Sequence, residues 1–126
     1  MSRLKTILLA GVLTLGAPLN AFGQQNLAQT FAHCVGRLSA EMEHQWLLND
    51  ANAEKTEAHR TYMIALLRAV MPPESGRWVL AQRVDAKMAH ASLLTRATFN
   101  DDPEDAQWAR TRADIEMSLC LGLVLS

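Results

Sequence analysis

Two cysteines, Cys34 and Cys120, are the residues of this sequence with the most definite chemistry. The stretch FAHCVGRL places His33 beside Cys34, so one hypothesis is a reactive thiol or a metal-binding pair. Neither cysteine belongs to a CxxC or CxxCH motif, which argues against a redox pair and against covalent haem attachment. The other hypothesis is a structural disulfide, which is what two cysteines in a small exported chain usually form.

The first 23 residues are typical of a cleavable signal peptide. Arg3 and Lys5 give a positive start, residues 6–19 form an apolar run, and Ala21 and Gly23 supply small residues near the cleavage point. The apolar run is too short to span a bilayer comfortably. We therefore expect residues 1–23 to be removed and residues 24–126 to form one domain. The product would be periplasmic or secreted, without a stable membrane anchor.

The charge balance argues against a nucleic-acid partner. The whole chain has a formal net charge of −1, and loss of the two basic residues of the leader makes it more negative. Nucleic-acid binding requires clustered positive charge that displaces counterions. We expect no nucleic acid among the partners.

Three turn clusters, at residues 49–52, 71–76 and 100–103, divide the expected mature chain, residues 24–126, into four segments of similar length. The last cluster places Asp102 at an N-cap and Pro103 at the first helical position, which is a strong helix-start signal. Apolar residues recur at helical spacing and no alternating strand pattern is present. The sequence therefore predicts an all-α protein, an antiparallel up-down four-helix bundle held by one disulfide.

The helical spacing also predicts which residues form the core. In an antiparallel bundle, Cys34 near the start of the first helix and Cys120 near the end of the fourth would share one end, which favours the disulfide and leaves His33 in solvent. The expected core positions are Leu27, Phe31, Val35, Leu38, Met42 and Trp46, then Tyr62, Ala65, Leu66, Ala69 and Val70, then Leu80, Val84, Met88, Ala91 and Thr95, and finally Ala106, Ala109, Ala113, Met117, Cys120 and Val124.

The sequence contains no recognisable catalytic motif. No hydrolase elbow, zinc-protease helix, phosphate-binding glycine loop or dinucleotide fingerprint occurs in the sequence. The acidic residues of the first two segments project away from the apolar positions and are typical of a solvated helix face. We therefore expect a protein without catalytic activity.

Methionine and histidine offer one alternative function. The pairs in MEH (42–44) and MAH (88–90) cannot share an ion, because residues two apart on a helix project in nearly opposite directions, and His44 and His90 face away from the expected core. Met42, His59 and Met63, however, could meet between the first two helices and hold haem or copper in a periplasmic carrier. Methionine more often fills gaps in a core. We expect no cofactor and keep the carrier as the alternative.

The last two segments carry apolar residues opposite their expected core positions. A helix in a bundle buries one face, so a second apolar face would be exposed and available for association. We expect a binding or interaction module whose partner is a second copy or another envelope protein. The sequence leaves the partner, pathway and oligomeric state open. The predicted interaction face consists of Trp108, Ile115, Leu119, Val79 and Leu93.

Overall fold

The computed structural model describes residues 19–125, and within that range every regular element is an α-helix. The helices are α1 (Leu19–Leu47), α2 (Ala53–Val70), α3 (Gly76–Phe99) and α4 (Pro103–Leu125). The predicted all-α class is confirmed for these residues. Residues 1–18 of the expected signal peptide lie outside the described part of the chain, and residues 19–23 belong to α1.

The helices end at the predicted turn clusters for local chemical reasons. Asn49 has a φ of 53°, the left-handed conformation that commonly follows a helix, and it terminates α1. Pro72 and Pro73 lie in the turn after α2, where they cannot continue a helix. Asp102 Oδ1 accepts hydrogen bonds from the backbone N–H groups of Glu104 and Asp105 at 3.0 and 3.3 Å, which confirms the predicted cap of α4.

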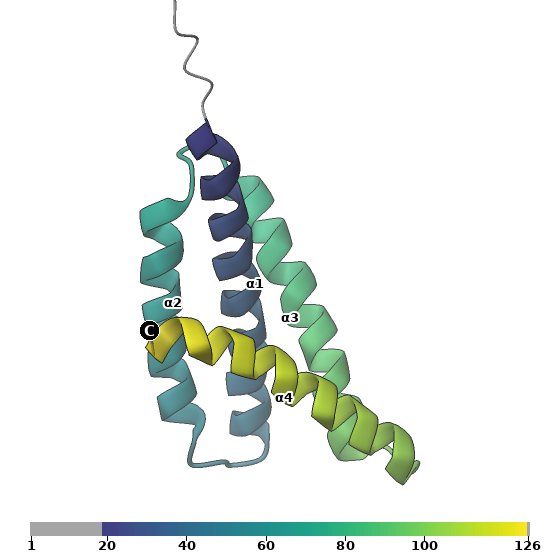
Figure 1. Cartoon of the computed structure of the whole chain (residues 1–126). Coiled ribbons are helices and arrows are strands. Elements are labelled where there is room, and N and C mark those ends of the chain that lie inside the picture. Colours follow the sequence, from purple (N-terminus) through teal and green to yellow (C-terminus); the bar gives the residue numbers. More distant parts are fainter. Residues whose placement is uncertain (1–18, 126) are drawn as a thin grey trace, which may run out of the picture.

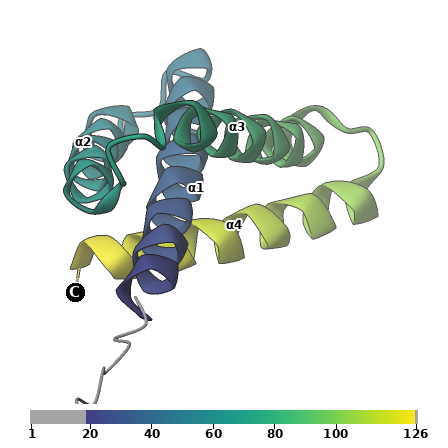
Figure 2. The same cartoon turned by 90° about the horizontal axis from the view of Figure 1, so that it is seen from above.

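The arrangement of the helices differs from a regular bundle. Helices α2 and α3 lie on either side of α1, whereas α4 runs obliquely across α1 (Figure 1). Seen from above, α4 lies on one side of α1, and α2 and α3 lie towards the other (Figure 2). The expected up-down topology is therefore not confirmed, because α4 does not run alongside its neighbours.

Small side chains on α4 explain how it can cross so closely. Ala109, Ala113 and Cys120 are all buried and face the other helices. Side chains this small let two backbones approach at an angle without interlocking ridges along their whole length. Cys34 lies near the middle of α1, because α1 begins at Leu19, earlier than the sequence pattern indicates. The expectation that the two cysteines meet at one end of the bundle is wrong for α1.

The core of the described residues forms two clusters. The larger one surrounds the cysteines and includes Val35, Leu38, Met63 and Leu67. The smaller one joins α1, α3 and α4 through Ala40, Leu94 and Ala113. The predicted positions of α4 are buried or half-buried, but several of those of the other helices are exposed: Leu27, Trp46, Tyr62, Ala65, Ala69, Leu80, Val84, Met88 and Thr95.

The predicted core face of α3 is wrong, because the opposite face of this helix is the buried one. Val79, His90, Leu94 and Ala97 are the buried residues of this helix, and Val79 is 3% exposed. Both faces of α3 carry apolar residues at helical spacing, so periodicity alone does not decide between them. Packing against α1 determines which of the two faces is buried.

Gly36 allows α1 and α3 to approach very closely. A Cβ atom at this position would lie 2.3 Å from the backbone oxygen of Arg83 and 2.9 Å from the backbone nitrogen of Lys87. Both neighbours are backbone atoms, which cannot rotate away as a side chain would. The α1–α3 contact therefore requires glycine here.

Candidate functional site

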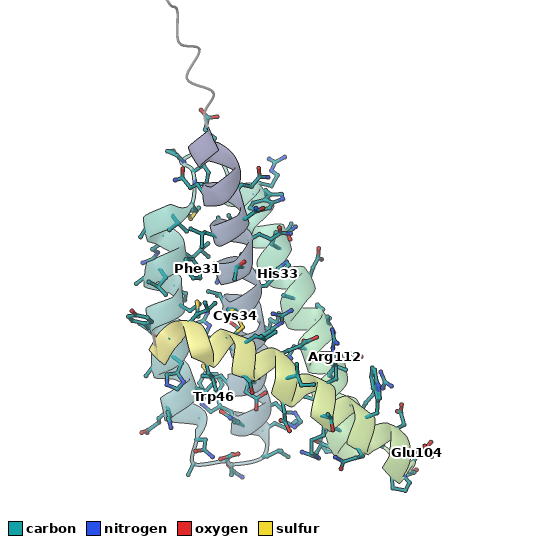
Figure 3. The ribbon with its side chains drawn as sticks, viewed as in Figure 1. Phe31, His33, Cys34, Trp46, Glu104 and Arg112 are labelled. Carbon is teal, nitrogen blue, oxygen red and sulfur yellow. A yellow bond between two sulfur atoms is a disulfide. The ribbon has the colours of Figure 1, made fainter. Side chains whose placement is uncertain are left out.

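The disulfide fixes the end of α4 to the middle of α1. Cys34 and Cys120 lie at disulfide distance, with Sγ atoms 2.02 Å apart and Cα atoms 5.4 Å apart, and 86 positions separate them in the sequence (Figure 3). His33 is not part of this chemistry. Its Nε2 lies 2.8 Å from Gln82 Oε1 on α3, so the ring is half-buried between two helices and not in solvent as expected.

The outer face of α4 is the clearest candidate for a binding surface. Trp108, Ile115 and Leu119 are 56%, 51% and 66% exposed, whereas Ala109, Ala113 and Cys120 on the inner face are buried. Residues 108, 115 and 119 are separated by seven and four positions, which places them on one side of the helix. Large apolar side chains on one exposed helix face often mark a contact surface. We call these three residues the outer α4 face.

An ion pair, Arg96 with Asp105, lies beside the tryptophan of this face. The guanidinium carbon of Arg96 lies 5.0 Å from the centre of the Trp108 ring, within the range of a cation–π contact. Arg96 also forms a salt bridge with Asp105 in the first turn of α4. The hydrogen bond from Arg96 holds the pKa of the Asp105 carboxyl below its ordinary value, and the same bond raises the pKa of Arg96. Arg96 therefore connects the end of α3 to the start of α4 beside Trp108.

The predicted contribution of α3 to the interaction face requires correction. Val79 belongs to the core around the disulfide and cannot present its side chain to a partner. Leu93 is half-buried and packs against the smaller core cluster. The large apolar residues that α3 exposes are Phe99 at its end and Leu80, Val84 and Met88, and the last three lie on the face that the sequence pattern assigned to the core. The exposed part of the predicted face is therefore confined to α4.

A buried polar cluster holds α4 against α1 and α3. His90 of α3 is 0% exposed, and its Nε2 lies 3.1 Å from Glu41 Oε2 on α1. Its Nδ1 lies 3.5 Å from Glu116 Oε2 on α4, without hydrogen-bond geometry. Glu116 in turn contacts Arg37 at 3.4 Å and Arg112 at 3.0 Å. One imidazole and two carboxylates thus join three helices.

The helical pattern of the sequence did not reveal this cluster, because it predicts that His90 faces away from the core. The signal was available in the alternative stripe of α3, where residues 79, 86, 90, 94 and 97 recur at intervals of three, four and seven. Selecting that stripe as the core would have buried His90. Its carboxylate partners on two other helices have no signature in the local pattern.

The proposed Met and His ligands are not gathered around one opening. His59 lines a cavity of about 210 Å³ between α1, α2 and α4, together with Leu38, Glu41 and Met117. Met42 and Met63 are buried and do not line it, and Met63 packs into the core around the disulfide. Their positions are those of methionines that fill gaps in a core.

In the described range, 19–125, no group of three or more His, Cys, Asp and Glu side chains is arranged to hold a metal ion. No helix in this same range has the length and apolarity to cross a bilayer. Comparison of the chain with protein-family models, curated proteins and solved structures finds no match.

Proposed function

We propose that this chain is an exported, non-enzymatic binding module that associates with another protein through the outer α4 face. The observation that carries the proposal is the division of α4 into a buried face of small residues and an exposed face that presents Trp108, Ile115 and Leu119. The first partner to test is a second copy of the chain, because a self-complementary apolar face favours a symmetric dimer.

The energetics of the outer α4 face suit association. Complete burial of a large apolar side chain contributes about 1.5–3 kcal/mol. The three residues of the outer α4 face together could therefore offset a substantial part of the free-energy cost of association. Tryptophan is among the commonest anchors of protein interfaces. The contact between Arg96 and Trp108 restricts the indole ring before a partner arrives, which reduces the entropy lost on binding.

Export is proposed from two features that support each other. The first 23 residues have the charge and apolar pattern of a cleavable leader. Cys34 and Cys120 are placed for a disulfide, a bond that persists in oxidising compartments such as the periplasm or the extracellular space.

The test is to measure association of the wild type and of Trp108→Asp and Leu119→Asp variants by light scattering over a range of concentrations. A charge in the middle of an apolar contact is costly to desolvate. We therefore expect the wild type to dimerise and each variant to dissociate at least tenfold more readily, with unchanged helical content.

The matched control is Tyr62→Asp on α2, where the replaced side chain is also about half exposed but belongs to a different surface. It should leave association unaltered. If the wild type stays monomeric at every concentration and captures no envelope protein, or if Tyr62→Asp has the same effect as Trp108→Asp, the proposed function is wrong.

A further inference from the structure

A second surface feature lies on the side of α1 away from the disulfide. A cavity of about 140 Å³ opens there, with Gly36 and Ser39 of α1 in its lining, Arg60 of α2 on one wall and Arg83 of α3 on the other. Gly36 and Cys34 are two positions apart, so they project about 200° apart from α1. The backbones of α2 and α3 do not come close to each other, which leaves the cavity open between them. We call this cavity the arginine groove.

The positive charge of the arginine groove is not balanced by acids. The side chain of Arg83 forms no hydrogen bond or ion pair with any described residue, and neither does the side chain of Arg68. Burial lowers the pKa of Arg83, and the positive charges of Arg60 and Arg68 on α2 lower it further. The one carboxylate in the lining, Glu43, forms a 2.7 Å ion pair with Lys87.

One of these arginines is held in place by the protein. Arg60 Nε donates a 2.7 Å hydrogen bond to the buried Ser39 Oγ, and Ser39 Oγ donates to the backbone oxygen of Val35 at 2.7 Å. The terminal N–H groups of Arg60 have no partner among residues 19–125. A guanidinium group fixed through Nε presents its other donors to an oxyanion at little further entropic cost.

Apolar side chains border the same cavity. Leu80 and Val84 line it together with the arginines, and both are about half exposed. Met88, one turn further along α3, is 64% exposed and extends this apolar edge. The combination of a cationic cavity and an adjoining apolar edge matches a ligand that is anionic at one end and apolar at the other.

We propose that the arginine groove binds the phosphate of an anionic membrane lipid, with Arg60 and Arg83 on the phosphate oxygens and Leu80 and Val84 against the acyl chains. Arginine binds phosphate through paired N–H donors, and a basic surface with adjoining apolar residues is typical of proteins that lie on anionic membranes. A cavity of about 140 Å³ accommodates a phosphate group but not a peptide helix. This site is independent of the outer α4 face.

The test uses protein purified from the envelope of expressing cells and measures co-sedimentation with vesicles. The vesicles consist of phosphatidylcholine alone or of phosphatidylcholine with phosphatidylglycerol. We expect binding to the anionic vesicles only, with weakening in high salt. Arg83→Gln should reduce the affinity about tenfold, and Arg83→Lys, which keeps the charge but loses the paired donors, should reduce it less.

Two controls outside both proposed surfaces separate this site from the general charge and apolarity of the surface. Arg112→Gln removes an exposed cation of α4 that does not line the groove, and Leu27→Ser removes an apolar side chain of α1 as exposed as Val84. Both should bind anionic vesicles like the wild type, whereas Val84→Ser should bind them more weakly. Circular dichroism and urea unfolding verify that each variant is folded.

Three outcomes would overturn the proposal. The first is an absence of binding to anionic vesicles. The second is equal loss in Arg83→Gln and Arg112→Gln, which would indicate attraction by diffuse charge. The third is binding of inorganic phosphate or of an acidic peptide at the groove without vesicle binding. Loss of self-association in the α4 variants would test the proposed function and leave this result unchanged.

Discussion

His90 Nε2 lies 3.1 Å from Glu41 Oε2 in a position that solvent does not reach, and Glu116 approaches the other side of the same ring. Because a carboxylate can only accept a hydrogen bond, the imidazole donates its Nε2 proton to Glu41. The His90 ring, which belongs to α3, therefore connects α1 on one side with α4 on the other.

The first prediction concerns this ring. His90→Ala leaves two carboxylates facing each other across an empty space, so we expect a loss of about 2–4 kcal/mol in the free energy of unfolding. Equilibrium urea unfolding measures it. His44→Ala is the control, because His44 is half-buried and makes a single side-chain hydrogen bond, to Thr98 at 2.9 Å. It should cost about 1 kcal/mol. Equal losses in the two variants would show that the cluster does not hold α4.

The second prediction concerns Gly36. Gly36→Ala drives a Cβ atom into the backbone of α3, so we expect α1 and α3 to separate and the free energy of unfolding to fall by about 2–3 kcal/mol or more. Gly122→Ala is the opposite case, because nothing lies within 4 Å of its added Cβ and alanine is a better helix former. It should stabilise the protein by up to about 1 kcal/mol. A neutral Gly36→Ala variant in urea unfolding would contradict the close packing of these helices.

The third prediction concerns the disulfide. The bond closes a loop between residues 86 positions apart, so in the chain-entropy model its loss costs up to about 4.5 kcal/mol. The variant with both cysteines replaced by alanine should unfold at correspondingly lower urea concentration, and reduction of the wild type should have a similar effect. Thiol titration of the denatured, unreduced protein should find no free thiol. Two free thiols would contradict the pairing.

The fourth prediction concerns the salt bridge between Arg96 and Asp105. In the folded protein the pKa of the Asp105 carboxyl lies below its ordinary value of 3.8, mainly because of the hydrogen bond from Arg96. The ionised Asp105 carboxylate therefore contributes its full stabilisation above the pKa that this group has in the unfolded chain. The stabilisation is lost as the pH falls through the lower pKa that the group has in the folded protein. Asp105→Asn should be less stable than the wild type at neutral pH, and the difference should shrink in acid.

Thermal unfolding of both proteins from pH 7 to pH 2 measures this effect. Asp101→Asn, which changes an exposed residue in the turn just before α4, is the control and should follow the wild type at every pH. A constant difference between Asp105→Asn and the wild type across the whole range would contradict the linkage.

Local chemistry made the helices and their ends predictable. Proline and capping residues act on their own segment, so the breaks near Asn49, Pro72 and Asp102 could be assigned without knowledge of the fold. The pairing of Cys34 with Cys120 followed from there being only two cysteines in a chain with a leader-like start. The outward position of Trp108, Ile115 and Leu119 followed from the small residues on the other side of α4.

Tertiary packing decided what the sequence pattern left open. Both faces of α3 are apolar, and the close contact at Gly36 selects the face with Val79 and His90. The oblique course of α4 depends on contacts with two other helices at once, which a pattern within one segment does not encode. The arginine groove is lined by residues from separate helices, so a pattern within one segment could not predict it either.

The bond between Cys34 and Cys120 encloses α2, α3 and all three interhelical turns in one ring of chain. A protease that cuts the backbone once in any of these turns leaves the two pieces joined by sulfur. Such a nicked molecule would migrate as two fragments on an electrophoresis gel only after reduction. A chain exposed to extracellular proteases could therefore be cleaved once and still keep its parts together.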